Sequence, residues 1–168
     1  MVTAESIREM QGPLKKEFRE NPAAAQRTLV AEGVLGENRT VCEIGSHHGT
    51  IAAGLHPLTG GDGTFACSAN MLLEALVGCA GVTLGVVSTA LGIELVDPRI
   101  RAEGDLDFRG TLAVERSVPV GFQAIRLIIS FETTADDDQV AKLLELTERY
   151  CVVHQTLAKG VDCSIQRG

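Results

Sequence analysis

The chain has 168 residues, which is a typical length for one domain, and we expect a single domain over residues 1–168. It is 45% hydrophobic and 22% charged, values that exclude disordered, collagen-like and coiled-coil proteins. The formal net charge of −7 argues against nucleic acid or an anionic membrane surface as partner, because both require a basic face.

The N-terminal third predicts a helix followed by strands. Residues 4–20 are charged and carry apolar side chains at helical spacing, so we expect a loose helix or arm within 1–22, broken at Gly12-Pro13. Residues 26–35 and 39–46 alternate in polarity, which predicts two strands joined by a short hairpin connection. A third strand is expected over 50–55.

A long uncharged stretch follows. Between Glu74 and Glu94 lie 19 residues, ALVGCAGVTLGVVSTALGI, which nearly reach the length of a membrane span. The flanks are acidic and lack the Lys and Arg residues that orient membrane helices. We therefore favour a helix over about 70–92 that is buried on all sides in a soluble protein, and a membrane-spanning helix is the alternative.

The C-terminal half predicts more strands and a second helical region. Strands are expected over 99–108, where polarity alternates strictly, over 111–117 and over 123–133. Acidic residues 136–138 suit a helix N-terminus, and this helix should break near Cys151, continue as a short helix to Ala158, and lead into a last strand over 161–166. Two separated helices among antiparallel strands indicate an α+β fold.

Two groups of polar residues are candidates for phosphate or metal binding. The loop at 60–63, GGDG, lacks the lysine of a phosphate-binding loop, which favours an ordinary loop. His47, His48 and His56, with Cys42 nearby, are candidate metal ligands. Adjacent histidines on a strand point to opposite faces, so we favour polar residues at strand ends over a metal site.

The cysteine content suggests an intracellular protein. Five cysteines are an odd number without short regular spacing, and no apolar run near the N-terminus resembles a signal peptide. We therefore expect a cytoplasmic protein with free thiols. Cys42 and Cys163 fall on apolar faces of expected strands and are interpreted as core residues, whereas Cys67 has no assigned role.

Two cysteines lie in positions where a thiol can react. Cys79 lies mid-helix between small residues that leave room around its sulfur, and Cys151 lies where the second helix breaks. His154 follows Cys151 by three residues and could favour its thiolate, although a solvent-facing histidine is the simpler interpretation. On residue type alone, each thiol is more often structural than reactive.

Two motifs carry a resemblance to a known family. The run SANMLLEALVGCAGVTLGVVSTALGI resembles the central-helix signature of the OsmC/Ohr family, the osmotically inducible protein C and organic hydroperoxide resistance proteins. The segment ERYCVVHQTLAKGVDCSIQ is similar to that family's second cysteine site, and the spacing of 72 residues between Cys79 and Cys151 fits the family pattern. The similarity extends over about 26–166.

The resemblance implies an OsmC-like fold, in which antiparallel sheets surround a long central helix and two chains form an intertwined homodimer. It also implies a thiol peroxidase that needs no metal or organic cofactor. Cys79 would attack an organic or hydrogen peroxide as thiolate, and Cys151 would resolve the sulfenic acid to a disulfide. A dithiol reductant such as a lipoylated protein would reopen that disulfide, and Arg39, with Arg27 behind it, is the expected assisting arginine.

The chain departs from the family pattern at two positions. The family's catalytic glutamate falls ten residues before the first cysteine, where this chain has Ala69, and the usual proline after the second cysteine is Val152. The alternative to a peroxidase is therefore a non-enzymatic dimer of the same fold that binds a small molecule or senses redox state.

Overall fold

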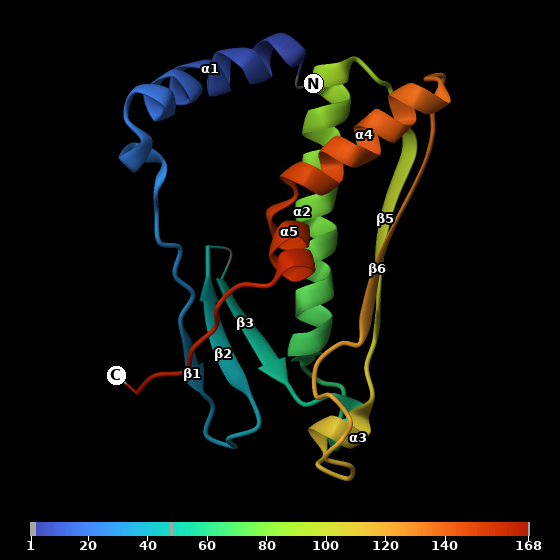
Figure 1. Ribbon diagram of the computed structural model, residues 1–168. Coiled ribbons are helices and arrows are strands. Elements are labelled where there is room, and N and C mark those ends of the chain that lie inside the picture. The colour runs from blue at the N-terminus through green and yellow to red at the C-terminus, as the bar shows by residue number, and fades with distance from the viewer. Residues whose placement is uncertain (1–2, 48, 168) are drawn as a thin grey trace. The chain divides into compact units, whose positions relative to one another are not determined.

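A computed structural model describes residues 3–47 and 49–167 (Figure 1). The chain forms two compact units, one built from residues 1–24, 75–101 and 127–168, and the other from residues 25–74 and 102–126. We call them the helical unit and the hairpin unit. His48 lies outside the described residues.

The helical unit contains α1 (Ala4–Glu20), most of α2 (Ser68–Leu91), α4 (Asp137–Tyr150) and α5 (Val152–Lys159). Parts of β5 (Val96–Asp105) and β6 (Ala124–Glu132), which pair as a two-stranded sheet, complete it. Its buried core joins Leu84 and Val87 of α2 to Ile93 and Leu143. This core fixes the C-terminal half of α2 against α4.

Reciprocal side-chain caps fix where two helices of this unit begin. Asp136 accepts a hydrogen bond from the Gln139 backbone N–H, and the Gln139 side chain accepts one from the Asp136 N–H. Thr3 and Ser6 cap α1 in the same way. Each capping box satisfies two backbone donors that a helix N-terminus otherwise leaves without partners.

The hairpin unit contains a four-stranded sheet in the order β1 (Gly33–Leu35), β2 (Cys42–Ser46), β3 (Gly49–Gly54) and β4 (Ala66–Cys67). The β1–β2 and β2–β3 pairs are antiparallel, whereas β3 and β4 run parallel. Short 3-10 helices lie at Pro22–Ala25, where the chain passes from the first unit's residues to the second's, and at Pro57–Thr59.

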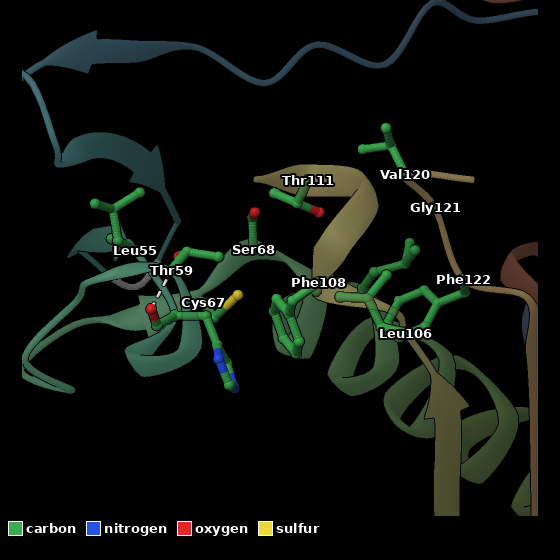
Figure 2. A pocket seen from close by; sticks show the side chains of 14 residues that line it. Leu55, Thr59, Cys67, Ser68, Leu106, Phe108, Thr111, Val120, Gly121 and Phe122 are labelled. Carbon is green, nitrogen blue, oxygen red and sulfur yellow. Dashed lines mark hydrogen bonds between the residues drawn. The ribbon is translucent and has the colours of Figure 1, made fainter. Parts of the chain in front are cut away.

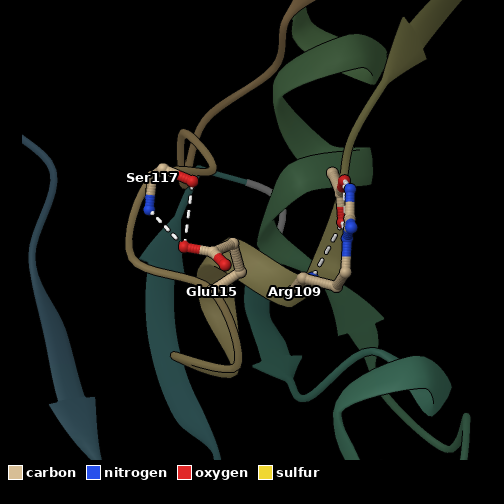
Figure 3. A network of polar contacts seen from close by, with 4 residues as sticks. Arg109, Glu115 and Ser117 are labelled. Atoms are coloured by element: carbon tan, nitrogen blue, oxygen red, sulfur yellow. Dashed lines mark hydrogen bonds and ion pairs between the residues drawn. The ribbon is translucent and has the colours of Figure 1, made fainter.

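A short helix, α3 (Phe108–Thr111), and the turns after it replace the strand expected over 111–117. Asp107 caps α3 and also pairs with the Arg109 guanidinium, while the Glu115 carboxylate accepts two hydrogen bonds from Ser117 (Figure 3). Ala113 adopts a φ of 55°. These local bonds turn the chain back, so that prediction is wrong.

Most of the other expected elements are confirmed. The central helix, the strands over 50–55, 99–108 and 123–133, and the break at Cys151 all appear, within a mixed α+β architecture. Strand 26–35 shrinks to its last three residues and strand 39–46 to Cys42–Ser46.

Two further expectations are wrong. Helix α1 runs through Gly12-Pro13 without a break, since the proline leaves only one turn of the exposed helix without its backbone bond. Residues 161–167 form no strand, because a strand needs a paired neighbour and none of the described strands pairs with them. Consequently Cys163 is exposed rather than a core residue.

The burial of α2 also differs from expectation. It is the one described helix that is long and apolar enough to span a membrane by length and composition. Only one of its faces is buried in the chain, through Leu76, Ala80, Leu84 and Val87. Val82, on another face, remains 71% exposed. A single chain therefore does not bury this helix on all sides.

Candidate functional site

The structure brings Cys79 and Cys151 together within the helical unit. Cys79 lies in the middle of α2, one residue before the buried Ala80, and its side chain is partly buried. Cys151 lies between α4 and α5, which Figure 1 shows beside the middle of α2. The site thus joins two segments that are 72 residues apart in sequence.

Cys151 connects two helices through its backbone. Its N–H donates to the Thr147 carbonyl at 3.0 Å, which ends α4, and its carbonyl accepts from the Gln155 N–H at 2.9 Å, which begins α5. The residue has no solvent exposure. These bonds fix Cys151 at the bend between α4 and α5. The first backbone N–H groups of α5 lie at this bend as well.

Hydrogen-bond donors lie around the sulfur of Cys79. Burial opposes ionisation of this thiol, but the Val153 N–H, the Cys151 thiol and the Val152 N–H, with a smaller contribution from Thr83, outweigh it and lower the pKa of Cys79. The amides of Val152 and Val153 begin α5, and a helix N-terminus favours negative charge. The site therefore stabilises a Cys79 thiolate.

The pKa of Cys151 moves in the opposite direction. Burial is the main cause that raises it, and the hydrogen bond to Cys79 and the negative charge there raise it further, against the N–H donors of His154 and Val153. One thiol is thus favoured as the anion, while its neighbour keeps its proton. This is the division of protonation that a nucleophile and a resolving thiol require.

The backbone donors of α5 are the functional groups that the sequence analysis missed. Val152 stands where the family pattern has proline, and a proline would have no N–H to donate. The sequence does show that Val152 replaces the family's proline and so keeps a backbone N–H. That N–H is recognised as a donor to Cys79 only when the direction of α5 is known. The contribution of Thr83, four residues after Cys79 on α2, could have been found from helical spacing.

Arg39 and Ala69 belong to the hairpin unit. Arg39 lies exposed in the turn between β1 and β2, where its φ is 58° and its N–H donates to the Gly36 carbonyl at 2.9 Å. Ala69, in the first turn of α2, lines a pocket of about 390 Å³ together with Cys67 and Ser68 (Figure 2). The residue at the position of the family's glutamate therefore contributes only a methyl group to the pocket wall.

The histidines serve other contacts. His56 accepts a hydrogen bond from the Leu58 N–H at 3.1 Å, and its ring stacks on Phe108 with centroids 4.6 Å apart. His47 is exposed, and the buried Nδ1 of His154 has no hydrogen-bond partner among the described residues. No three His, Cys, Asp or Glu side chains cluster as metal ligands in the part of the chain that is described.

Cys42 packs inside the sheet of the hairpin unit. It is partly buried on β2, and its sulfur lies against Gly33, where a Cβ would approach it to 2.8 Å. The glycine makes room for the sulfur, which fits the expected packing role of Cys42.

Comparison with known proteins decides the family. The model of the family described as OsmC-like protein matches residues 61–166, more than half of the chain and the whole segment that contains Cys79 and Cys151. The chain belongs to the OsmC-like protein family. No curated protein sequence matches it.

Solved structures share the OsmC-like fold. An OsmC-like protein from Mycoplasma pneumoniae superposes with a TM-score of 0.66 at 17% identity, covering 81% of this chain and 90% of that one. An organic hydroperoxide resistance protein from Elizabethkingia anophelis gives 0.58 at 13% identity, covering 82% and 92%. A structure from Legionella pneumophila described as an organic hydroperoxide resistance protein gives 0.56 at 16% identity, covering 81% and 93%. Because the sequence identities are low, these structural similarities establish the fold of the chain and nothing further.

Proposed function

We propose that this OsmC-like protein is a thiol-dependent peroxidase that reduces organic hydroperoxides or hydrogen peroxide. The observation that carries the proposal is the adjacent pair of Cys79 and Cys151, with the pKa of the first lowered and that of the second raised. Two proteins of similar fold are described as organic hydroperoxide resistance proteins, which supports the same chemistry.

In the first step the Cys79 thiolate attacks the outer oxygen of the peroxide. An S–O bond forms, the O–O bond breaks, and the leaving alkoxide takes a proton to become an alcohol, or water from hydrogen peroxide. Cys79 is oxidised to a sulfenic acid and the peroxide is reduced. The amides of Val152 and Val153 favour the thiolate that this step needs.

In the second step the sulfur of Cys151 attacks the sulfenic sulfur. A disulfide forms and water leaves, made of the sulfenic hydroxyl group and one further proton, which comes from the Cys151 thiol or, if Cys151 reacts as thiolate, from solvent. An external dithiol, such as a lipoylated protein, then reduces the disulfide by two successive thiol exchanges and leaves as its own disulfide. Because Cys151 is buried next to Cys79, resolution precedes further oxidation.

The active form in this proposal is a cytoplasmic homodimer. The exposed apolar side chains of α2, among them Val82 and Val86, and the unpaired tail with its exposed Val161 and Ile165 are surfaces that a second copy can cover. We place Arg39 in the role of a cation that assists the thiolate, with Arg27 as the second candidate. The reducing cytoplasm would keep both thiols available.

The proposal is tested by stopped-flow reaction of the reduced protein with cumene hydroperoxide and with hydrogen peroxide. The wild type should consume peroxide and Cys79→Ser should not. Arg39→Gln should slow the first step by about tenfold if its guanidinium hydrogen-bonds the sulfur, while Arg27→Gln should have little effect.

The alanine at the position of the family's glutamate favours one competing function. Without a carboxylate there, the same thiol pair would form its disulfide slowly and report redox state instead of removing peroxide. If wild type and Cys79→Ser consume peroxide at the same low rate, the peroxidase proposal is wrong and this second function takes its place.

A further inference from the structure

The two sulfurs of the candidate site differ in how far solvent reaches them. Cys151 has no solvent exposure, whereas Cys79, in the middle of α2, is only partly buried. Once these thiols have joined in a disulfide, an external thiol can open it by attacking either sulfur. The difference in burial distinguishes the two possible points of attack.

Access to Cys79 is also a requirement of the proposed function. A peroxide must reach the sulfur of Cys79, so any assembly of chains that carries out this step keeps a path to that sulfur open. No step of the proposed cycle brings a substrate to Cys151, whose buried sulfur receives only the sulfur of Cys79. A thiol that follows the path of the peroxide therefore meets Cys79 first.

The acidities of the two thiols act in the other direction. A disulfide opens faster when the departing sulfur belongs to the more acidic thiol, and the pKa of Cys79 is the lower of the two. On acidity alone, Cys151 would be attacked and Cys79 would depart. Attack, however, requires the incoming sulfur to touch the sulfur that it attacks, which burial prevents at Cys151. Access therefore outweighs acidity.

The fold also assists the departure of Cys151. Burial is the main cause that raises its pKa, followed by the hydrogen bond to Cys79 and the negative charge there. Both contributions of Cys79 disappear when this sulfur is bonded to an external thiol, because it then carries no charge. The N–H donors of His154 and Val153, which lower the pKa of Cys151, remain. Cys151 thus leaves as thiolate more readily than its acidity in the reduced pair indicates.

We propose that the thiol that reduces the Cys79–Cys151 disulfide attacks the sulfur of Cys79 and expels Cys151. This inference rests on the disulfide of the proposed function. The incoming thiolate forms an S–S bond with Cys79, the Cys79–Cys151 bond breaks, and its electron pair leaves on Cys151, which then takes a proton. The second thiol of a dithiol next attacks the reductant's own bonded sulfur, so Cys79 leaves as thiolate and the reductant becomes a disulfide.

The test forms the disulfide without peroxide. Diamide, which accepts two electrons and two protons from a pair of thiols, oxidises the reduced full chain. The oxidised protein is mixed with excess 2-mercaptoethanol, quenched at successive early times in denaturing acid, and its free thiols are capped with N-ethylmaleimide. Cleavage after glutamate gives residues 75–94, whose only cysteine is Cys79, and trypsin gives residues 150–159, whose only cysteine is Cys151. Mass spectrometry then locates the mercaptoethanol.

The native protein should carry mercaptoethanol on Cys79 and N-ethylmaleimide on Cys151. At the earliest times we expect at least about fivefold more adduct on Cys79 than on Cys151. The same reaction in concentrated guanidinium chloride is the matched control, because unfolding removes the difference in burial. There the adduct should divide nearly equally between the two cysteines.

Three results would overturn the proposal. They are an adduct mainly on Cys151, the same distribution in the native and the unfolded chain, and no adduct on Cys79 at any time. Failure of diamide to join Cys79 to Cys151 would overturn it as well, together with the second step of the proposed function. Because the test uses no peroxide, a protein that gives the Cys79 adduct but consumes no peroxide would contradict the proposed function alone.

Discussion

The thiol of Cys151 donates a hydrogen bond to the sulfur of Cys79, and this contact separates the acidities of the two groups. Burial raises the pKa of both thiols and the first amides of α5 lower both, whereas this contact acts in opposite directions, lowering the pKa of Cys79 and raising that of Cys151. The fold therefore makes one thiol the better anion and keeps the other protonated beside it. Every prediction about the thiol site starts from this asymmetry.

The two cysteines should differ in their pH dependence of alkylation. Because the pKa of Cys79 is lowered, its thiolate is populated below the pH at which an ordinary thiol ionises, about 8.5. Its reaction with iodoacetamide should reach half its plateau rate below that pH, whereas the raised pKa of Cys151 delays labelling to higher pH. Mass spectrometry of the two peptides measures both profiles. A Cys79 midpoint at or above that of an ordinary thiol would contradict the site description.

Val152→Pro should weaken the Cys79 thiolate. Proline suits the first position of a helix, so α5 should remain, but the N–H that donates to the Cys79 sulfur is lost. We expect the alkylation midpoint of Cys79 to move to higher pH and its rate near neutrality to fall by about fivefold.

The matched control for this substitution is Val152→Ala, which removes most of the side chain and keeps the N–H. Its alkylation profile should follow the wild type. If the alanine and proline variants behave alike, the amide of Val152 has no role in the thiolate and the side chain explains the effect.

Thr83→Val tests the hydroxyl donor on α2. The substitution keeps the shape of the side chain and removes the hydroxyl that lowers the pKa of Cys79. We expect slower alkylation of Cys79 near neutral pH, by roughly twofold to fivefold. Thr89→Val is the comparison, since the Thr89 hydroxyl donates to the Gly85 carbonyl at 2.7 Å in the same manner as Thr83 donates to the Cys79 carbonyl at 2.8 Å. If Thr83→Val and Thr89→Val slow alkylation of Cys79 equally, the cause is a general change in helix α2 and Thr83 has no specific role at the thiol.

Ile165→Asp tests the proposed dimer. Ile165 is fully exposed and unpaired in the single chain, so the change should leave a monomer intact. If the tail pairs with a second copy, a carboxylate at this position should dissociate the dimer, which light scattering at micromolar concentration would measure. Gln166→Asp adds the same charge to the next residue, whose side chain would point to the other face of a strand, and should keep the dimer. A wild-type monomer would contradict the proposal directly.

Local patterns in the sequence were sufficient to predict most elements. The 24-residue helix α2, the alternating strands β5 and β6 and the break at Cys151 all follow from periodicity and from the end signals of helices. The predicted strands are wrong where the structure of a segment depends on its contacts with other segments. Residues 161–167 alternate like a strand but pair with none of the described strands, and residues 111–117 are turned back by the bonds of Asp107 and Glu115.

The candidate site was likewise predictable from the sequence only in part. Cys79 and Cys151 could be selected from two motifs, but the means by which this chain favours the thiolate could not. That depends on the direction of α5, which brings the N–H groups of Val152 and Val153 to a sulfur on another helix. Backbone donors leave no side-chain signature in a sequence, so a search for a charged residue in place of the missing glutamate overlooks them.

The most direct test of the central claim is a single-turnover experiment analysed by mass spectrometry. Reduced protein is mixed with one equivalent of cumene hydroperoxide, quenched with an alkylating agent and digested without reduction. The account predicts a Cys79–Cys151 disulfide in the wild type, a sulfenic acid at Cys79 in Cys151→Ser that a second equivalent of peroxide oxidises to sulfinic acid, and unoxidised Cys151 in Cys79→Ser. A disulfide that joins other cysteines, or oxidation of Cys151 in the absence of the Cys79 thiol, would contradict it.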